Sequence, residues 1–171
     1  MGTGNLLLIG FMGVGKGRLA RELAQRKGCF ALDTDDLIES FENRKIRKIF
    51  KEDGEPYFRA LERQVAEWLE KSVRNTVIST GGGFFAVENL NSIGTVVFLR
   101  AGFDSILNKM VTHPKAEKKL KKRPLFRDPK AAEKLFYERQ PLYLAKADLV
   151  IDMEGKNISE VAESLIAKVP F

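Results

Sequence analysis

Short runs of apolar residues alternate along the chain with segments in which apolar residues recur every three or four positions. The continuous runs predict buried β-strands, because such runs are typical of strands covered on both faces. They lie at residues 6–9, 30–33, 76–79, 95–99 and 149–151. Segments with helical spacing lie between and after them. The alternation favours an α/β fold of three layers, with helices on both faces of a mostly parallel sheet.

Local signals predict where several helices begin and end. Residues 128–141 predict a helix that starts with an N-cap aspartate and a proline and runs to about Pro141. Asn157 and Glu160 predict a capping box for a terminal helix. Residues 37–54 are mixed and charged, and we expect short helical pieces there. After them, one helix is expected to face the core with the apolar stripe Phe58, Leu61, Val65, Trp68 and Leu69.

The composition is that of one globular domain. The chain has 171 residues, of which 44% are hydrophobic and 30% charged, and no linker or repeat divides it. Cys29 is the only cysteine, so an internal disulfide is excluded and a cytoplasmic location is expected. The apolar stretch at residues 6–12 is too short to span a bilayer. We therefore expect a soluble protein with no targeting segment and no membrane partner.

A formal charge of +6 raises the question of an anionic partner. Much of the excess lies in residues 112–123, which carry six Lys or Arg against one acid and contain no aromatic residue. Single-stranded nucleic acids are usually bound by basic grooves with interleaved aromatic residues. The distribution therefore favours small anionic ligands in a mobile basic segment, and we expect no nucleic-acid partner.

A glycine-rich loop follows the first predicted strand. Residues 10–16 read Gly-Phe-Met-Gly-Val-Gly-Lys, the pattern of a phosphate-binding loop between a strand and a helix. Backbone N–H groups and the helix N-terminus form an anion site there, and Lys16 adds a positive charge for the β- and γ-phosphates. ATP binding is expected at Gly13, Val14, Gly15, Lys16, Gly17 and Arg18.

Five further motifs follow this loop: Asp33-Thr34-Asp35, Phe58-Arg59 with Glu62, Gly81-Gly82-Gly83, Arg123-Pro124-Leu125 and Glu138-Arg139-Gln140-Pro141-Leu142-Tyr143. In this order, and over nearly the whole chain, the set resembles the shikimate kinase family. The resemblance implies a P-loop kinase fold of the nucleoside-monophosphate-kinase type, with a five-stranded parallel sheet of order 2-3-1-4-5 and a mobile lid. It implies a single domain over residues 1–171, with a core at 1–33, 63–111 and 126–171, a substrate-binding segment at 34–62 and a lid at 112–125.

The resemblance also implies roles for particular residues. Arg59 and Arg139 would hold the carboxylate of shikimate, and a guanidinium fork suits that planar group. Glu62, one turn after Arg59, is placed to orient it. Residues 81–83 would let the substrate approach the backbone closely. Asp35 would position the attacking hydroxyl or accept its proton.

Further residues would act on the nucleotide and its metal. Asp33 would face magnesium through water, although a helix-capping carboxylate is the simpler interpretation. Arg123 would close over the phosphates from the lid, so that Lys16, Asp35 and Arg123 are the candidate catalytic residues. Lys156, in the loop after the last strand, is a positional candidate for contact with adenine.

Gly17 departs from the family pattern, which has Ser or Thr as a magnesium ligand at this position. No hydroxyl residue adjoins it in the sequence. Only the position of the metal site is therefore retained. We expect weaker magnesium binding and a kcat about 10 to 10³-fold below that of Gly17→Ser, the range of one lost electrostatic contact.

The predicted activity is ATP-dependent phosphorylation of the 3-hydroxyl of shikimate, which gives shikimate 3-phosphate and ADP in aromatic amino acid biosynthesis. Magnesium is the expected cofactor, ATP the co-substrate, and a monomer the expected state. Two alternatives stay open. The chain could be a degenerate kinase that binds nucleotide and shikimate without turnover, or a kinase for another small carboxylated alcohol.

Overall fold

The computed structural model describes residues 4–112, 114 and 124–169. Its centre is a sheet of five parallel strands in the order β2-β3-β1-β4-β5. The strands are β1 Leu6–Ile9, β2 Ala31–Asp33, β3 Val77–Ser79, β4 Thr95–Arg100 and β5 Leu149–Asp152. The predicted three-layer α/β fold and the strand order are both confirmed.

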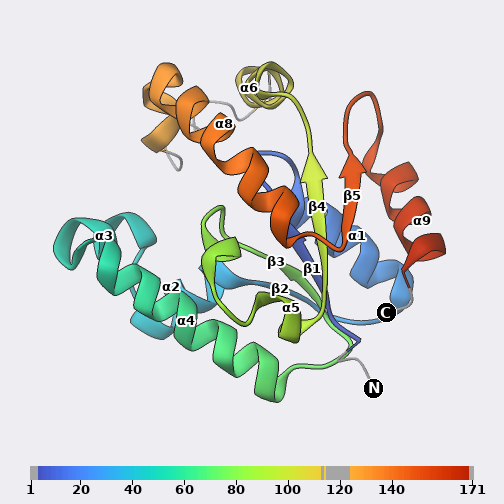
Figure 1. Cartoon of the computed structure of the whole chain (residues 1–171), viewed down its shortest axis with the longest axis horizontal. Coiled ribbons are helices and arrows are strands. Elements are labelled where there is room, and N and C mark those ends of the chain that lie inside the picture. The colour runs from blue at the N-terminus through green and yellow to red at the C-terminus, as the bar shows by residue number, and fades with distance from the viewer. Residues whose placement is uncertain (1–3, 113, 115–123, 170–171) are drawn as a thin grey trace.

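The helices cover both faces of this sheet (Figure 1). The first helix, α1 Lys16–Lys27, packs with the last, α9 Ile158–Lys168, on one face, and α8 Pro129–Lys146 packs across β4 on the other. The other helical elements in the described ranges are α2 Thr34–Glu42, α3 Ile46–Glu52, α4 Gly54–Ser72, the 3₁₀ turn η1 Phe84–Ala86, α5 Leu90–Ile93, α6 Phe103–Val111 and the 3₁₀ turn η2 Pro124–Arg127.

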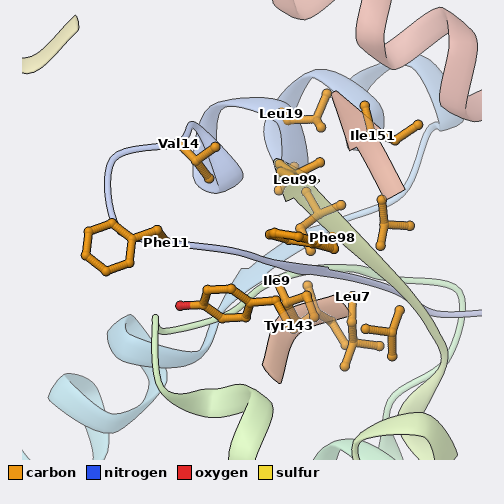
Figure 2. Close-up of a cluster of buried hydrophobic side chains, with 14 of the residues drawn as sticks. Leu7, Ile9, Phe11, Val14, Leu19, Phe98, Leu99, Tyr143 and Ile151 are labelled. Carbon is orange, nitrogen blue, oxygen red and sulfur yellow. The ribbon is translucent and has the colours of Figure 1, made fainter. Parts of the chain in front are cut away.

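Strand β1 lies at the centre of the main core, and all four of its residues are fully buried. Figure 2 shows Leu7 and Tyr143 on one side of this strand and Leu19 on the other. Burial on both faces explains why the strand reads as a continuous apolar run. The core therefore fixes the carboxyl end of β1, from which the glycine-rich loop leaves.

A second, smaller core lies between α2, α3 and α4. It consists of Ile38, Ile49, Phe58 and Leu61, each at most 6% exposed. These residues belong to the segment 34–62, so this part of the chain has apolar packing of its own. The segment adjoins the carboxyl end of β2, because α2 follows that strand directly (Figure 1).

Two capping predictions are confirmed. The side chain of Asp128 accepts a hydrogen bond from the Ala131 N–H at the start of α8. Asn157 and Glu160 form both hydrogen bonds of a capping box at α9. Each satisfies amide groups that the first helical turn leaves without partners.

Three local predictions are wrong. Trp68 was expected in the buried stripe of α4 but is 45% exposed, because Glu62 and Ala66 share the buried face and turn Trp68 toward its edge. The last predicted helix before β5 does not end at Pro141 but continues to Lys146. The carbonyl that Pro141 leaves without an N–H partner belongs to exposed Tyr137, where water can satisfy it. Phe30 is 84% exposed and precedes β2.

None of the helices in the described ranges combines the length and the apolar character that crossing a bilayer requires. Most of the predicted basic segment and most of the predicted lid, including Arg123, lie outside the described residues.

Candidate active site

The glycine-rich loop connects the carboxyl end of β1 to α1 through a backbone that only glycine adopts easily. Gly10 has a φ of 142°, and a Cβ there would lie 2.7 Å from the carbonyl oxygen of Leu99. Gly15, the N-cap of α1, has a φ of 115°. Side chains at these positions would strain the turn or displace β4. The two glycines therefore shape the loop so that the first amides of α1 face a common concavity.

Lys16 lies folded back over this loop. Its Nζ donates hydrogen bonds to the carbonyl oxygens of Gly10 and Phe11, at 2.6 and 3.1 Å, and the residue is 8% exposed. The ammonium group is thus held beside the loop amides. The N–H of Val14 donates to the Phe11 carbonyl at 3.3 Å, and the Val14 side chain packs in the core.

Three predicted substrate residues converge on the glycine triplet that follows β3. A Cβ on Gly81 would lie 2.5 Å from Oδ1 of Asp35, and one on Gly82 would lie 3.3 Å from Nη1 of Arg139. A Cβ on Gly83 would overlap the guanidinium of Arg59 and lie 2.8 Å from its Cζ. The structure therefore brings together one carboxyl group and two guanidinium groups from α2, α4 and α8. Glycine is required here because their side chains occupy the space that a Cβ would take.

Arg59 is held from both sides along α4. Its Nη1 donates to Glu62 Oε2 at 2.5 Å, and its Nε and Nη2 donate to Glu55 Oε1 at 3.1 and 2.8 Å. Glu62 is buried, and burial raises its pKa although the guanidinium opposes this. Glu62 therefore orients Arg59, as its i,i+3 spacing suggested, and a guanidinium edge is fixed near Gly83.

Asp35 is the most perturbed acid of the site. Burial, followed by the nearby charges of Asp33 and Glu62, raises its pKa to about 7, although Lys16 acts in the opposite direction. A carboxyl group with a pKa near neutrality can hold or release a proton under physiological conditions. Asp35 is therefore suited to exchange a proton with a hydroxyl group placed beside Gly81.

Asp33 uses its two carboxylate oxygens differently. Oδ1 caps α2 by accepting hydrogen bonds from the N–H groups of Asp35 and Asp36, at 3.0 and 3.4 Å. Oδ2 accepts a 2.8 Å hydrogen bond from Oγ of Ser79. The capping interpretation therefore accounts for one oxygen, while the other belongs to a polar pair beside Gly17.

Two residues that stabilise the glycine triplet had no role in the sequence prediction. Tyr143 donates its hydroxyl to the Gly82 carbonyl at 2.6 Å, beside a 3.2 Å hydrogen bond from Arg139 Nη1. Thr34 Oγ1 accepts from the Gly81 N–H at 2.9 Å. Both residues lie inside motifs already noted, but no sequence signal tells which backbone group they contact. Burial raises the pKa of Tyr143 to about 12, so its hydroxyl stays protonated as a donor.

Tyr143→Phe is expected to lower kcat/KM for the substrate bound at the glycine triplet about tenfold. It should also lower the free energy of unfolding by about 1 kcal/mol, the typical value of one hydrogen bond. The ring still fills its place in the core beside Ile9 (Figure 2), but Gly82 is held less firmly. Steady-state kinetics and urea unfolding measure the two effects. Tyr137→Phe, on the exposed side of the same helix, is the control. Unchanged kinetics with the stability loss present would mean that Tyr143 only supports the fold.

Two further predicted residues, Arg18 and Lys156, have exposed side chains. Arg18 is exposed on α1, and Lys156 is exposed in the loop between β5 and α9. That loop does come near the phosphate-binding loop, since a Cβ on Gly15 would lie 3.8 Å from Cδ1 of Ile158. The loop that carries Lys156 therefore comes near the phosphate-binding loop at Ile158, and contact of Lys156 with adenine stays a prediction.

Comparisons with known proteins agree on one family. The family model described as "Shikimate kinase" matches residues 12–170. Shikimate kinase of Helicobacter hepaticus is 38% identical over 162 residues, which cover 95% of this chain and 93% of that protein. The family-model match therefore includes the glycine-rich loop from Met12 on, the glycine triplet and the arginine motifs together.

Solved structures lead to the same family. Shikimate kinase from Acinetobacter baumannii in complex with shikimate superposes with a TM-score of 0.84 at 30% identity, covering 95% of this chain and 90% of that one. Shikimate kinase from Aquifex aeolicus gives a TM-score of 0.76 at 33% identity, with 95% and 94% covered. The similarity thus extends from sequence to the whole fold.

Proposed function

The chain belongs to the shikimate kinase family, and from this premise we propose that it transfers the γ-phosphoryl group of ATP to the 3-hydroxyl of shikimate. The products are shikimate 3-phosphate and ADP. The observation that carries the assignment is the convergence of Asp35, Arg59 and Arg139 on the glycine triplet. Lys16 and its loop supply the phosphate site at the neighbouring strand end.

Arg59 and Arg139 bind the substrate carboxylate. Support comes from their positions beside Gly82 and Gly83 and from the fixed orientation of Arg59. Hydrogen bonds between guanidinium and carboxylate are charge-assisted and can be bidentate, which favours one orientation of the ring. With the carboxylate held there, a ring hydroxyl can face Asp35 at the other end of the triplet.

Asp35 positions the attacking hydroxyl and takes up its proton. The hydroxyl oxygen forms a bond to the γ-phosphorus, the bond from that phosphorus to the β–γ bridging oxygen breaks, and ADP leaves with the electron pair. Phosphoryl transfer usually has a loose transition state, so orientation contributes more than base strength. The raised pKa of Asp35 makes the proton uptake feasible near neutral pH.

Lys16 and the loop amides bind the phosphates, together with Gly13, Val14, Gly15, Gly17 and Arg18. Lys16 carries its charge to the bond that breaks, and Arg123 is proposed to add a second charge from the lid. Magnesium, where bound, neutralises charge on the transferring phosphoryl group. Asp33 is available to it through water, since Oδ2 faces the start of α1. Lys156 is proposed near adenine. We also propose that the protein is a cytoplasmic monomer of one domain and that it has no nucleic-acid or membrane partner.

An acceptor panel tests the function. ADP release is followed with shikimate, with its carboxamide, and with other cyclic or linear carboxylated alcohols such as quinate and gluconate. The proposal predicts that shikimate gives the highest kcat/KM and that the carboxamide loses at least about tenfold, the value of one charged hydrogen bond. Faster turnover of another acid would assign the site to that alcohol.

Arg59→Lys is expected to raise KM for shikimate by about 10 to 100-fold, because lysine keeps the charge but loses the planar fork. KM for ATP should change less than about twofold, since the phosphate loop is not altered. Arg63→Lys, exposed on the same helix, is the matched control. An equal rise in both KM values would indicate a general disturbance of α4 and contradict the carboxylate role.

A further inference from the structure

Gly17 leaves the start of α1 without the hydroxyl that phosphate-binding loops usually offer to magnesium. A side-chain Cβ would fit at this position without a clash. A Cβ built there would lie 3.6 Å from Nη1 of Arg21, 3.7 Å from Oγ of Ser79 and 3.9 Å from Oδ2 of Asp33. All three are ordinary contacts, so no packing reason requires glycine. A hydroxyl and a carboxylate oxygen already lie beside the empty position.

The strand register brings Ser79 to this point. Ser79 is the last residue of β3, and in the parallel pairing its Cα partner on β2 is Asp33. The 2.8 Å hydrogen bond between their side chains follows from that pairing. Ser79 is 3% exposed and packs on the α1 side of the sheet. Its position is therefore fixed by the sheet and does not depend on a loop.

We propose that the hydroxyl of Ser79 supplies the magnesium-ligating oxygen that Gly17 lacks. A serine hydroxyl has one hydrogen to donate and two lone pairs. Donation to Asp33 Oδ2 uses the hydrogen and leaves the lone pairs for a cation. Magnesium–oxygen bonds are about 2.1 Å long. An oxygen 3.7 Å from the Cβ position of residue 17 is thus within reach of a cation held at that position.

The other potential ligands at the site are consistent with a single protein hydroxyl from Ser79. In the described ranges, no group of three or more His, Cys, Asp or Glu side chains is arranged to hold a metal. A cation here would draw most of its oxygens from nucleotide phosphates and water, as magnesium commonly does. The protein then needs to contribute only one hydroxyl ligand, which is hydrogen-bonded to one carboxylate. The inference rests on the proposed use of Mg·ATP, but not on the identity of the acceptor alcohol.

Manganese binding provides the test, because Mn²⁺ is paramagnetic and can stand in for magnesium. Its affinity for the protein with saturating ADP is measured by electron paramagnetic resonance in the parent, Ser79→Ala, Gly17→Ser and the double variant. We expect Ser79→Ala to weaken binding about tenfold in the parent and less than twofold beside Gly17→Ser. Thr76→Ala, before the opposite end of β3, is the control and should change nothing. ADP affinity in EDTA should be equal in all five proteins.

A direct ligand test uses Ser79→Cys. Thiolate prefers softer metals than magnesium, so Co²⁺ with ADP should show a sulfur-to-cobalt charge-transfer band that the parent, with only Cys29, lacks. An unchanged Mn²⁺ affinity in Ser79→Ala would overturn the inference. An equal loss in both backgrounds would also do so, because it would indicate only a displaced Asp33. In either case the acceptor panel still decides the proposed kinase activity separately.

Discussion

Lys16→Met is expected to lower kcat/KM for shikimate about 10³-fold or more. Lys16 is the one side chain of the loop that brings a full positive charge to the phosphates, and charge-stabilising groups of this kind contribute about 10² to 10³-fold each. Its ammonium is already held over the loop by the carbonyls of Gly10 and Phe11. Methionine has a similar length and fits a helix start, so the loss should fall on catalysis and nucleotide binding. Coupled kinetics and ATP calorimetry measure both.

Lys27→Met is the matched control, since it changes an exposed lysine at the other end of α1. It should keep kcat/KM within about twofold of the parent. Thermal unfolding of both variants establishes that the fold persists. A Lys16→Met protein that keeps more than about a tenth of the parent activity would show that the phosphates are bound elsewhere.

Asp35→Asn is expected to lower kcat by about 10² to 10⁴-fold, the range for loss of a general acid–base group. Asparagine keeps the size of the side chain and its contact with Gly81 but cannot accept the proton. KM for ATP should stay within about threefold, because Asp35 lies on the acceptor side of the site. Asp36→Asn, on the exposed side of the same turn, is the control. A kcat within tenfold of the parent would leave Asp35 only a binding role.

The same substitution should also change stability in a pH-dependent way. In the folded protein the pKa of Asp35 rises from 3.8 to about 7. Between these values the folded chain keeps a proton that the unfolded chain has lost, so this group makes the fold less stable as pH rises from about 4 to about 7. Asparagine does not ionise, so it removes this pH-dependent loss of folding stability. In EDTA without nucleotide, Tm of Asp35→Asn should exceed that of the parent most at pH 8, by less at pH 5, and by nothing once the pH falls below about 4.

Most of the fold could be predicted from the sequence, because buried parallel strands leave continuous apolar runs. The segments at β1 and β4 are examples, and their neighbours in the sheet followed from the family resemblance. Trp68 and Pro141 were predicted wrongly for tertiary reasons. A buried Glu62 shifted the inward face of α4, and solvent near Tyr137 let α8 continue past its proline.

The candidate site was predicted residue by residue but not as a set of contacts. Asp35, Arg59 and Arg139 were expected to share a substrate, and the structure brings all three to the glycine triplet. Ser79 was missed because its proximity to Gly17 depends on the register between β2 and β3. That register cannot be predicted from the sequences of such short parallel strands. The contact of Tyr143 with Gly82 was missed because the sequence does not distinguish a tyrosine that only packs in the core from one whose hydroxyl binds a particular backbone carbonyl.

A ³¹P NMR time course shows directly whether the protein transfers a phosphoryl group from ATP to shikimate. The protein is mixed with Mg·ATP and shikimate, and the phosphorus signals are followed until the ATP is consumed. We expect one new phosphomonoester that appears in step with ADP and whose phosphorus couples to the ring proton at C3. A spectrum that stays that of ATP, while calorimetry of the same sample shows that both ligands bind, would contradict it and identify a binding protein without turnover.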